Sequence, residues 1–152
     1  RRERFLGLSS GLLRVPGASA LDMTWGEDSS FAARLDALLA TGAAPTAFFC
    51  AHDGLAVTVV SEILSRGLRI PQDISVVGFG DFSAAKQIRP GLTTVKVFGA
   101  EFGAAAVRRL DARLRANGLP EFPARLYVPN RIVERGSVAS APKRAVWKRA
   151  AA

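Results

Sequence analysis

Residues that suit a small hydroxyl-bearing ligand follow three apolar runs of the chain. Trp25 ends the first run, Asp53 comes two residues after the second, and Asp81 comes two residues after the third. A tryptophan ring can cover the apolar face of a ligand, while separated carboxylates accept hydrogen bonds from its hydroxyl groups. Arg4, near the start of a predicted helix, is placed to join them. These residues are the candidate binding site.

Each candidate also has a plainer structural interpretation. Asp53 can cap the helix that follows it, and Asp81 can serve only to form a turn. Trp25 can be a core residue, and Arg4 can lie on a solvated helix face. His52 is the single histidine, and one histidine beside one aspartate does not make a metal site. We therefore expect no metal and no cofactor.

Two matches to enzyme motifs are rejected on context. The run 7–11, GLSSG, fits the nucleophile elbow of serine hydrolases, but that elbow needs a preceding strand, and residues 1–6 have a charged, helical pattern. The histidine of such a triad would also have to follow the aspartate, and none comes after His52. Gly78 and Gly80 follow a strand, but Ser83 stands where the third glycine of a dinucleotide fingerprint belongs. We expect no catalytic residue, and a hydrolase using Ser9 is the enzyme alternative.

The elements that would position these residues form an α/β fold. The runs 46–51 and 74–79 are short and continuously apolar, as are parallel strands buried on both faces. The segment 55–65 between them has a helical apolar stripe and is followed by Gly67 and Pro71, which end helices. Such a sheet is expected to be covered on both faces and to bind ligands beyond the carboxyl ends of its strands. Further expected helices are 1–13, 28–40 and 101–115, with a short helix or turn at 82–87, and further strands are 21–25, 92–97, 125–128 and 132–134.

Composition limits the function classes. The chain has 152 residues, 49% of them hydrophobic and 22% charged, which fits one globular domain. No apolar run approaches the ~20 residues of a membrane span, no signal peptide is recognised, and the single cysteine forms no intrachain disulfide, so we expect a cytoplasmic protein. The net charge is +8, but four of the basic residues lie in the stretch 138–152, which holds no acid. We interpret 138–152 as a disordered basic tail after a domain that covers 1–137.

Several segments in sequence together resemble the effector-binding core of LacI/GalR-type (lactose-repressor family) transcription regulators. No single segment is specific, but their order and spacing are. The matching segments are RFLG at 4–7, PTAFFCAHD at 45–53, RGLRIPQDISVVGF at 66–79, PGLTTV at 90–95 and RGS at 135–137.

The resemblance implies a two-lobed, periplasmic-binding-protein-like sensor of type I, of which this chain holds the second lobe and the segments that cross back to the first. Arg4 looks like the arginine that contacts the effector, Trp25 stands where many members have an aromatic residue, and Asp53 matches the aspartate that takes effector hydroxyls. Asp81 is a weaker candidate. The chain departs from the family pattern at three positions, where it has His52, Gly80 and Val97.

The partners that the resemblance implies are a sugar- or nucleoside-like effector, a second copy in a homodimer, and operator DNA. The DNA would be contacted only through an N-terminal helix-turn-helix that this chain does not contain. The alternative is a solute-binding component of a sugar transporter with the same fold. A further alternative is that the chain alone binds its effector weakly or not at all, because half of the cleft is missing from it.

Overall fold

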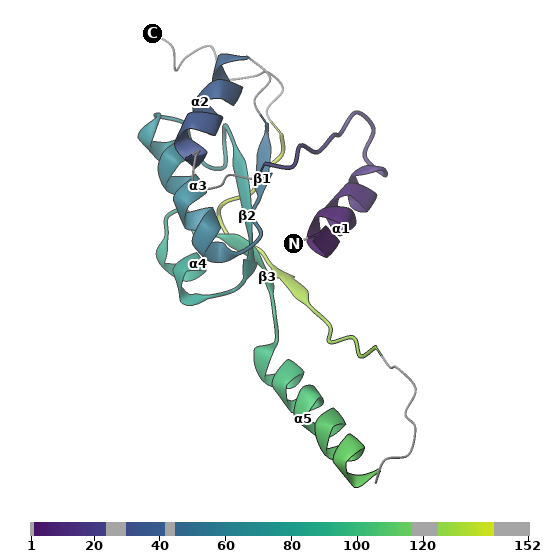
Figure 1. The fold of residues 1–152 in the computed structure, drawn as a ribbon. Coiled ribbons are helices and arrows are strands. Elements are labelled where there is room, and N and C mark those ends of the chain that lie inside the picture. The colour runs from purple at the N-terminus through teal and green to yellow at the C-terminus, as the bar shows by residue number, and fades with distance from the viewer. Residues whose placement is uncertain (1, 24–29, 42–44, 117–124, 142–152) are drawn as a thin grey trace.

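The computed structural model describes residues 2–23, 30–41, 45–116 and 125–141. A four-stranded sheet of order β1-β2-β3-β4 lies at its centre (Figure 1). The strands are β1 (Ala47–Phe49), β2 (Ser75–Gly80), β3 (Thr93–Lys96) and β4 (Arg131–Val133). The first three are parallel and β4 is antiparallel to β3. The α/β class is therefore confirmed, and the sheet is mixed rather than fully parallel.

All five predicted helices form, with boundaries displaced by a few residues. They are α1 (Arg2–Leu12), α2 (Phe31–Ala40), α3 (Asp53–Ser65), α4 (Ser83–Gln87) and α5 (Gly99–Arg115). Helix α2 begins at Phe31 because the Ser30 hydroxyl accepts a hydrogen bond from the Ala33 N–H at 3.2 Å. Helix α3 is capped by His52, so the interpretation of Asp53 as its cap is wrong.

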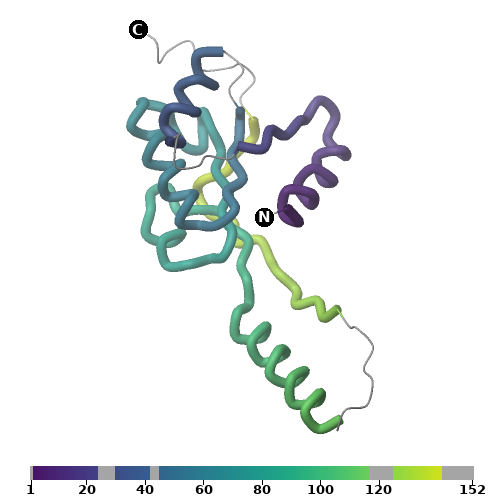
Figure 2. The backbone as a smooth tube through the Cα atoms, viewed as in Figure 1, coloured from purple at the N-terminus to yellow at the C-terminus, as the bar shows by residue number. Residues whose placement is uncertain are grey.

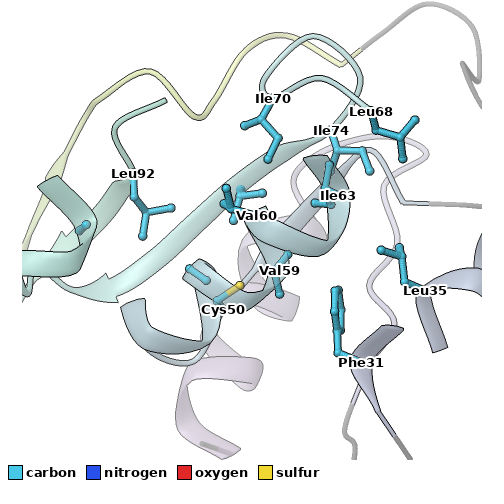
Figure 3. Packing of buried hydrophobic residues seen from close by; sticks show 13 residues of the cluster. Phe31, Leu35, Cys50, Val59, Val60, Ile63, Leu68, Ile70, Ile74 and Leu92 are labelled. Carbon is cyan, nitrogen blue, oxygen red and sulfur yellow. The ribbon is translucent and has the colours of Figure 1, made fainter. Parts of the chain in front are cut away.

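The hydrophobic core lies between the sheet and helices α2, α3 and α4, which share one side of it (Figures 1 and 3). Helix α3 supplies the central layer, and the edge of the Phe31 ring meets the Phe48 ring with centroids 5.7 Å apart. The fully buried side chains that carry this packing are Leu35, Val59, Ile63, Ile74, Val76 and Leu92. The core thus holds together β1, α3 and β2, the unit that the apolar pattern predicts.

The second face of the sheet is only partly covered. Helix α1 lies on that side (Figure 1), and Phe49, Val77, Phe79 and Val95 are half-buried. Helices therefore flank both faces of the sheet, as expected, but among the described residues the second face is less completely buried than the first.

Helix α5 and the segment that leads into β4 project away from the sheet (Figure 2). The apolar stripe of α5 is exposed, with Phe102, Leu110 and Leu114 at 61%, 59% and 71% of their full accessibility. The helix predicted for this segment is thus confirmed, but its apolar stripe is only partly covered by the described chain, where Phe102, Ala105 and Ala106 line a hollow with residues of the segment 125–128.

Two predicted strands do not form in the described residues. Residues 125–128 and 21–23 are irregular, and residues 24 and 25 lie outside the described part. Apolar patterns record a preference for burial, whereas a strand also needs a neighbour for its backbone hydrogen bonds. Leu21 is 74% exposed while Met23 packs against the core. No helix among the described residues has both the length and the apolar character needed to cross a membrane.

Candidate functional site

The carboxyl ends of the three parallel strands meet at one edge of the sheet. Phe49 of β1 pairs with Val77 of β2, and the last residue of β2, Gly80, pairs with Lys96, the last residue of β3. The loops after these strands carry His52 and Asp53, then Asp81. We call this the ligand edge. Its position confirms the expected geometry of the parallel strands.

Arg4 reaches the ligand edge from α1. Its Nη1 donates a hydrogen bond to the carbonyl oxygen of Ala51, two residues after β1. Its guanidinium carbon lies 3.9 Å from the centre of the Phe79 ring in β2. A guanidinium stacked on an aromatic ring and bonded to a backbone carbonyl is held in orientation while its other N–H groups remain able to donate. Arg4 is exposed, so a ligand can approach it.

Asp53 lies at the ligand edge but points inward. Its side chain is fully buried. Oδ2 accepts from the Phe82 backbone N–H at 2.7 Å, and Oδ1 accepts from the Thr94 hydroxyl at 2.6 Å. Because the two oxygens contact the β2–α4 turn and β3, Asp53 connects the segment after β1 with the end of β2 and with β3. A Cβ at Gly78 would collide with Oδ1, so a glycine is needed there for the carboxylate to fit.

Asp81 is engaged in an ion pair. The residue has a φ of 59° and follows Gly80, whose φ is 130°. Its Oδ1 lies 2.6 Å from Nη2 of Arg135, and the two side chains are 6% and 18% exposed. Arg135 also donates to the Leu92 carbonyl at 2.8 Å. The pair therefore connects the ligand edge to the segment that returns after β4.

His52, for which the sequence excluded a metal site and showed a departure from the family pattern, has a structural role at this edge. Its Nδ1 accepts a hydrogen bond from the Leu55 N–H at 3.0 Å and so caps α3. The ring is exposed at the ligand edge. Its place directly after an apolar run and before a helix is the sequence signal that could have identified it.

Two further cations lie at the end of β3. Lys96 Nζ is 5.5 Å and the Arg131 guanidinium carbon is 5.8 Å from the centre of the Phe98 ring. Lys96 and Arg131 are also register partners in the β3–β4 ladder. Alternation along β3 gives Lys96 the same side of the sheet as Thr94, which contacts Asp53. Sequence reasoning missed both cations because it did not place β4 beside β3.

The structure thus brings Arg4, Asp53 and Asp81 to one edge, as the sequence predicts. Trp25 lies outside the described residues. No group of three or more potential metal ligands occurs among the described residues. Ser9 lies within α1 and not in a strand–turn–helix elbow, so its local geometry does not fit a hydrolase nucleophile.

Cys50 directly follows β1, and its environment does not activate it as a nucleophile. Burial raises the pKa of its thiol to about 12, and the Asp53 carboxylate adds to the increase. At pH 8 such a thiol is ionised to about one part in ten thousand, whereas an ordinary thiol is ionised to about a quarter.

We expect iodoacetamide at pH 8 to modify the folded protein at least about 100-fold more slowly than the urea-unfolded protein. The rate in the folded state should increase as the pH is raised toward 12. Mass spectrometry gives an unambiguous readout, since Cys50 is the single cysteine of the chain. Equal rates for the folded and unfolded forms would show that the thiol is accessible and that this packing is incorrect.

Comparison with known proteins agrees with this geometry. A family model described as a periplasmic binding protein-like domain matches residues 8–138. One relative, the HTH-type transcriptional repressor PurR of Escherichia fergusonii, is 33% identical over 137 residues, which is 90% of this chain and 39% of the relative.

Solved structures with a similar fold include two transcription regulators. The lac repressor dimer bound to operator and the anti-inducer ONPF aligns with a TM-score of 0.76 at 27% identity, covering 91% of this chain and 48% of that one. The transcriptional regulator CelR–cellobiose complex aligns with a TM-score of 0.71 at 25% identity, covering 90% and 42%. The chain therefore spans less than half the length of each of these proteins.

Proposed function

Because the chain belongs to the periplasmic-binding-protein-like domain family, as an effector-binding domain of LacI/GalR-type transcriptional regulators, we propose that it senses a small polar metabolite at the ligand edge. The sugar, nucleoside or similar compound binds between this lobe and a second lobe, and the resulting closure changes operator affinity in a dimer. No catalysis is required.

The placement of Arg4 carries this proposal. Arg4 and Ala51 are 47 residues apart in the chain, yet the Arg4 side chain lies on the end of β1 and on Phe79 of β2. An exposed arginine held in that orientation is a preorganised binding group at the edge where parallel sheets bind ligands. Of the other candidates, Trp25 would supply an aromatic surface, while Asp53 and Asp81 would shape the edge through the contacts described above.

A ligand changes DNA affinity only to the extent that it prefers one of the two lobe arrangements. The segments that connect the lobes are therefore part of the mechanism. Arg135, in the return segment after β4, donates a hydrogen bond to Asp81 at the ligand edge. This contact gives a physical route from the bound effector to the arrangement of the lobes.

The test uses the complete gene product that carries this chain. Its binding to labelled DNA from upstream of its own gene is measured by fluorescence anisotropy, with and without a panel of sugars and nucleosides. We expect specific binding that at least one metabolite changes by about tenfold or more, a coupling free energy of about 1.4 kcal/mol. Specific DNA binding that no metabolite changes, or effector binding in a protein that never binds DNA, would contradict the proposal. The second result would favour a transport component.

A further inference from the structure

Helix α5 and residues 125–130 form an arm that projects from the sheet (Figure 2). The chain enters the arm after Lys96, the last residue of β3, and leaves it at Arg131, the first residue of β4. These two residues are register partners in the β3–β4 ladder. Within α5 only Ala105 is buried, so packing among the described residues does little to fix the arm. Its orientation relative to the sheet is therefore decided largely where the two strands end.

The turn between β3 and α5 is centred on Phe98. This residue has a φ of −86° and a ψ of 78°, and the Gly99 N–H donates a hydrogen bond to the Val97 carbonyl at 3.1 Å. These values describe an inverse γ-turn, which a single hydrogen bond closes. Hinges between moving parts are usually a few residues at the end of an element that absorb changes in φ and ψ. Phe98 is placed to act as such a hinge.

Two cations lie over the Phe98 ring. Lys96 Nζ is 5.5 Å and the Arg131 guanidinium carbon is 5.8 Å from the ring centre, both within the range of about 6 Å in which the face of an aromatic ring attracts a cation. Like charges on directly opposite residues of a ladder repel each other, and the ring offsets this repulsion. Lys96 belongs to the strand that leads into the arm and Arg131 to the strand that returns from it. The ring therefore connects both strands at the base of the arm.

These contacts depend on the orientation of the arm. The β3–β4 ladder fixes the backbone of Lys96 and Arg131, whereas the direction of the Phe98 side chain changes with the φ and ψ of its own turn. A rotation of the arm at Phe98 therefore moves the ring relative to both cations and weakens its contacts with them. An interaction that is present in one arrangement and weaker in another shifts the equilibrium between the two.

Resting on the proposed function, we propose that Phe98 is a hinge of the arm and that its contacts with Lys96 and Arg131 set the equilibrium between the two lobe arrangements when no effector is bound. The arm belongs to the segments that cross to the first lobe, so its orientation changes with that lobe. Phe98 then regulates DNA affinity without contacting the effector. Lys96 and Arg131 are positioning residues that act through the ring.

The experiment measures the distance between the arm and the sheet in the complete gene product, without DNA or effector, by double electron–electron resonance. Spin labels are attached at Ala112→Cys on α5 and Thr58→Cys on α3, two exposed positions. Cys50 is buried with a thiol pKa of about 12, so it is protected from labelling, and protein with only one of the two changes is the labelling control. Labelled subunits are diluted with unlabelled protein, so that each measured pair lies within one subunit.

A pair of substitutions at Phe98 separates the hinge from simple packing. Phe98→Leu keeps an apolar side chain but removes the aromatic face, and we expect it to broaden or shift the distance distribution. Phe98→Tyr keeps the face and should leave the distribution as in wild type. In the same protein without effector, Phe98→Leu should change DNA affinity by about two- to fivefold, the effect of losing one such contact from one of two arrangements. Circular dichroism confirms that each variant is folded.

Variants of the cations test the contacts themselves. Lys96→Gln and Arg131→Gln should each change the distance distribution in the direction that Phe98→Leu does. Neither should change it further when Phe98→Leu is already present, because the ring on which they act is then absent. Arg108→Gln, an exposed arginine of α5 outside the turn, is the matched control and should leave the distribution unchanged.

The outcomes separate this inference from the proposed function. A wild-type distribution in Phe98→Leu, or the same change in Phe98→Leu and Phe98→Tyr, would overturn the hinge and leave the proposed function standing. A changed distribution with unchanged DNA affinity would overturn the regulatory role of Phe98. DNA binding that no metabolite affects would overturn the proposed function, whereas the distance measurement needs neither DNA nor metabolite and would still report on the hinge.

Discussion

We expect Asp53→Ala to lower the free energy of unfolding by about 2–4 kcal/mol and to abolish the response to the effector. The substitution leaves the Phe82 N–H and the buried Thr94 hydroxyl without their acceptor. Each unsatisfied buried donor costs about 1–3 kcal/mol, and removal of a buried charge offsets part of the sum. The segment after β1 then loses its hydrogen bonds to the turn after β2 and to β3, so the geometry of the ligand edge also changes.

Urea unfolding followed by circular dichroism measures the first effect. Asp53→Asn should fall between wild type and alanine, since its amide oxygen can accept from one of the two donors while its NH2 group cannot accept from the other. Glu101→Ala, an exposed acidic residue in the first turn of α5, is the control and should change stability by less than about 1 kcal/mol. An Asp53→Ala protein as stable as wild type would show that the buried carboxylate is not satisfied in the way described.

The second large effect concerns the ion pair between the ligand edge and the return segment. We expect Arg135→Ala to lower the free energy of unfolding by about 2–4 kcal/mol, because it leaves the nearly buried Asp81 carboxylate unpaired. The Leu92 carbonyl also loses its donor. Arg135→Lys should recover part of the loss, since an ammonium cannot reproduce both contacts in the geometry of the guanidinium.

A double-mutant cycle with Asp81→Ala isolates the pair. The double variant should be less destabilised than the sum of the single variants, with a coupling of about 1 kcal/mol or more. The same variants should alter how strongly an effector changes DNA affinity, because the pair joins the two parts that must move together. Additive losses, together with an unchanged effector response, would mean that Asp81 and Arg135 act independently.

The sequence predicted secondary structure correctly where a hydrophobic pattern was compatible with only one type of element. The apolar runs around 46–51 and 74–79, with a helical stripe between them, allowed only a strand, a helix and a strand, and β1, α3 and β2 form there. The strand predicted at 125–128 does not form, because a short run of β-forming residues does not specify whether another strand lies beside it. The sequence also did not predict that β4 runs antiparallel to β3. The pairing depends on which segment lies beside β3 in the folded chain, and no local pattern contains that information.

The site was predictable in position but not in chemistry. Placement of Arg4, Asp53 and Asp81 at one edge followed from the parallel direction of the strands. The direction of the strands did not predict which of these side chains faces a ligand, because an aspartate in such a loop can point outward or inward. Its orientation depends on whether a backbone N–H and a hydroxyl from other segments lie within reach of it, as Phe82 and Thr94 do for Asp53.

The order of residues by itself determined the strand–helix–strand unit and the edge at which polar groups gather, because periodicity and turn residues act over short distances along the chain. Only the tertiary structure decided that the carboxylates of Asp53 and Asp81 are paired inside the fold, while Arg4 and the His52 ring stay exposed at the ligand edge. Hydrogen bonds and ion pairs between segments 29 to 54 residues apart set that balance. No local pattern encodes such contacts, since they exist only once the chain has folded.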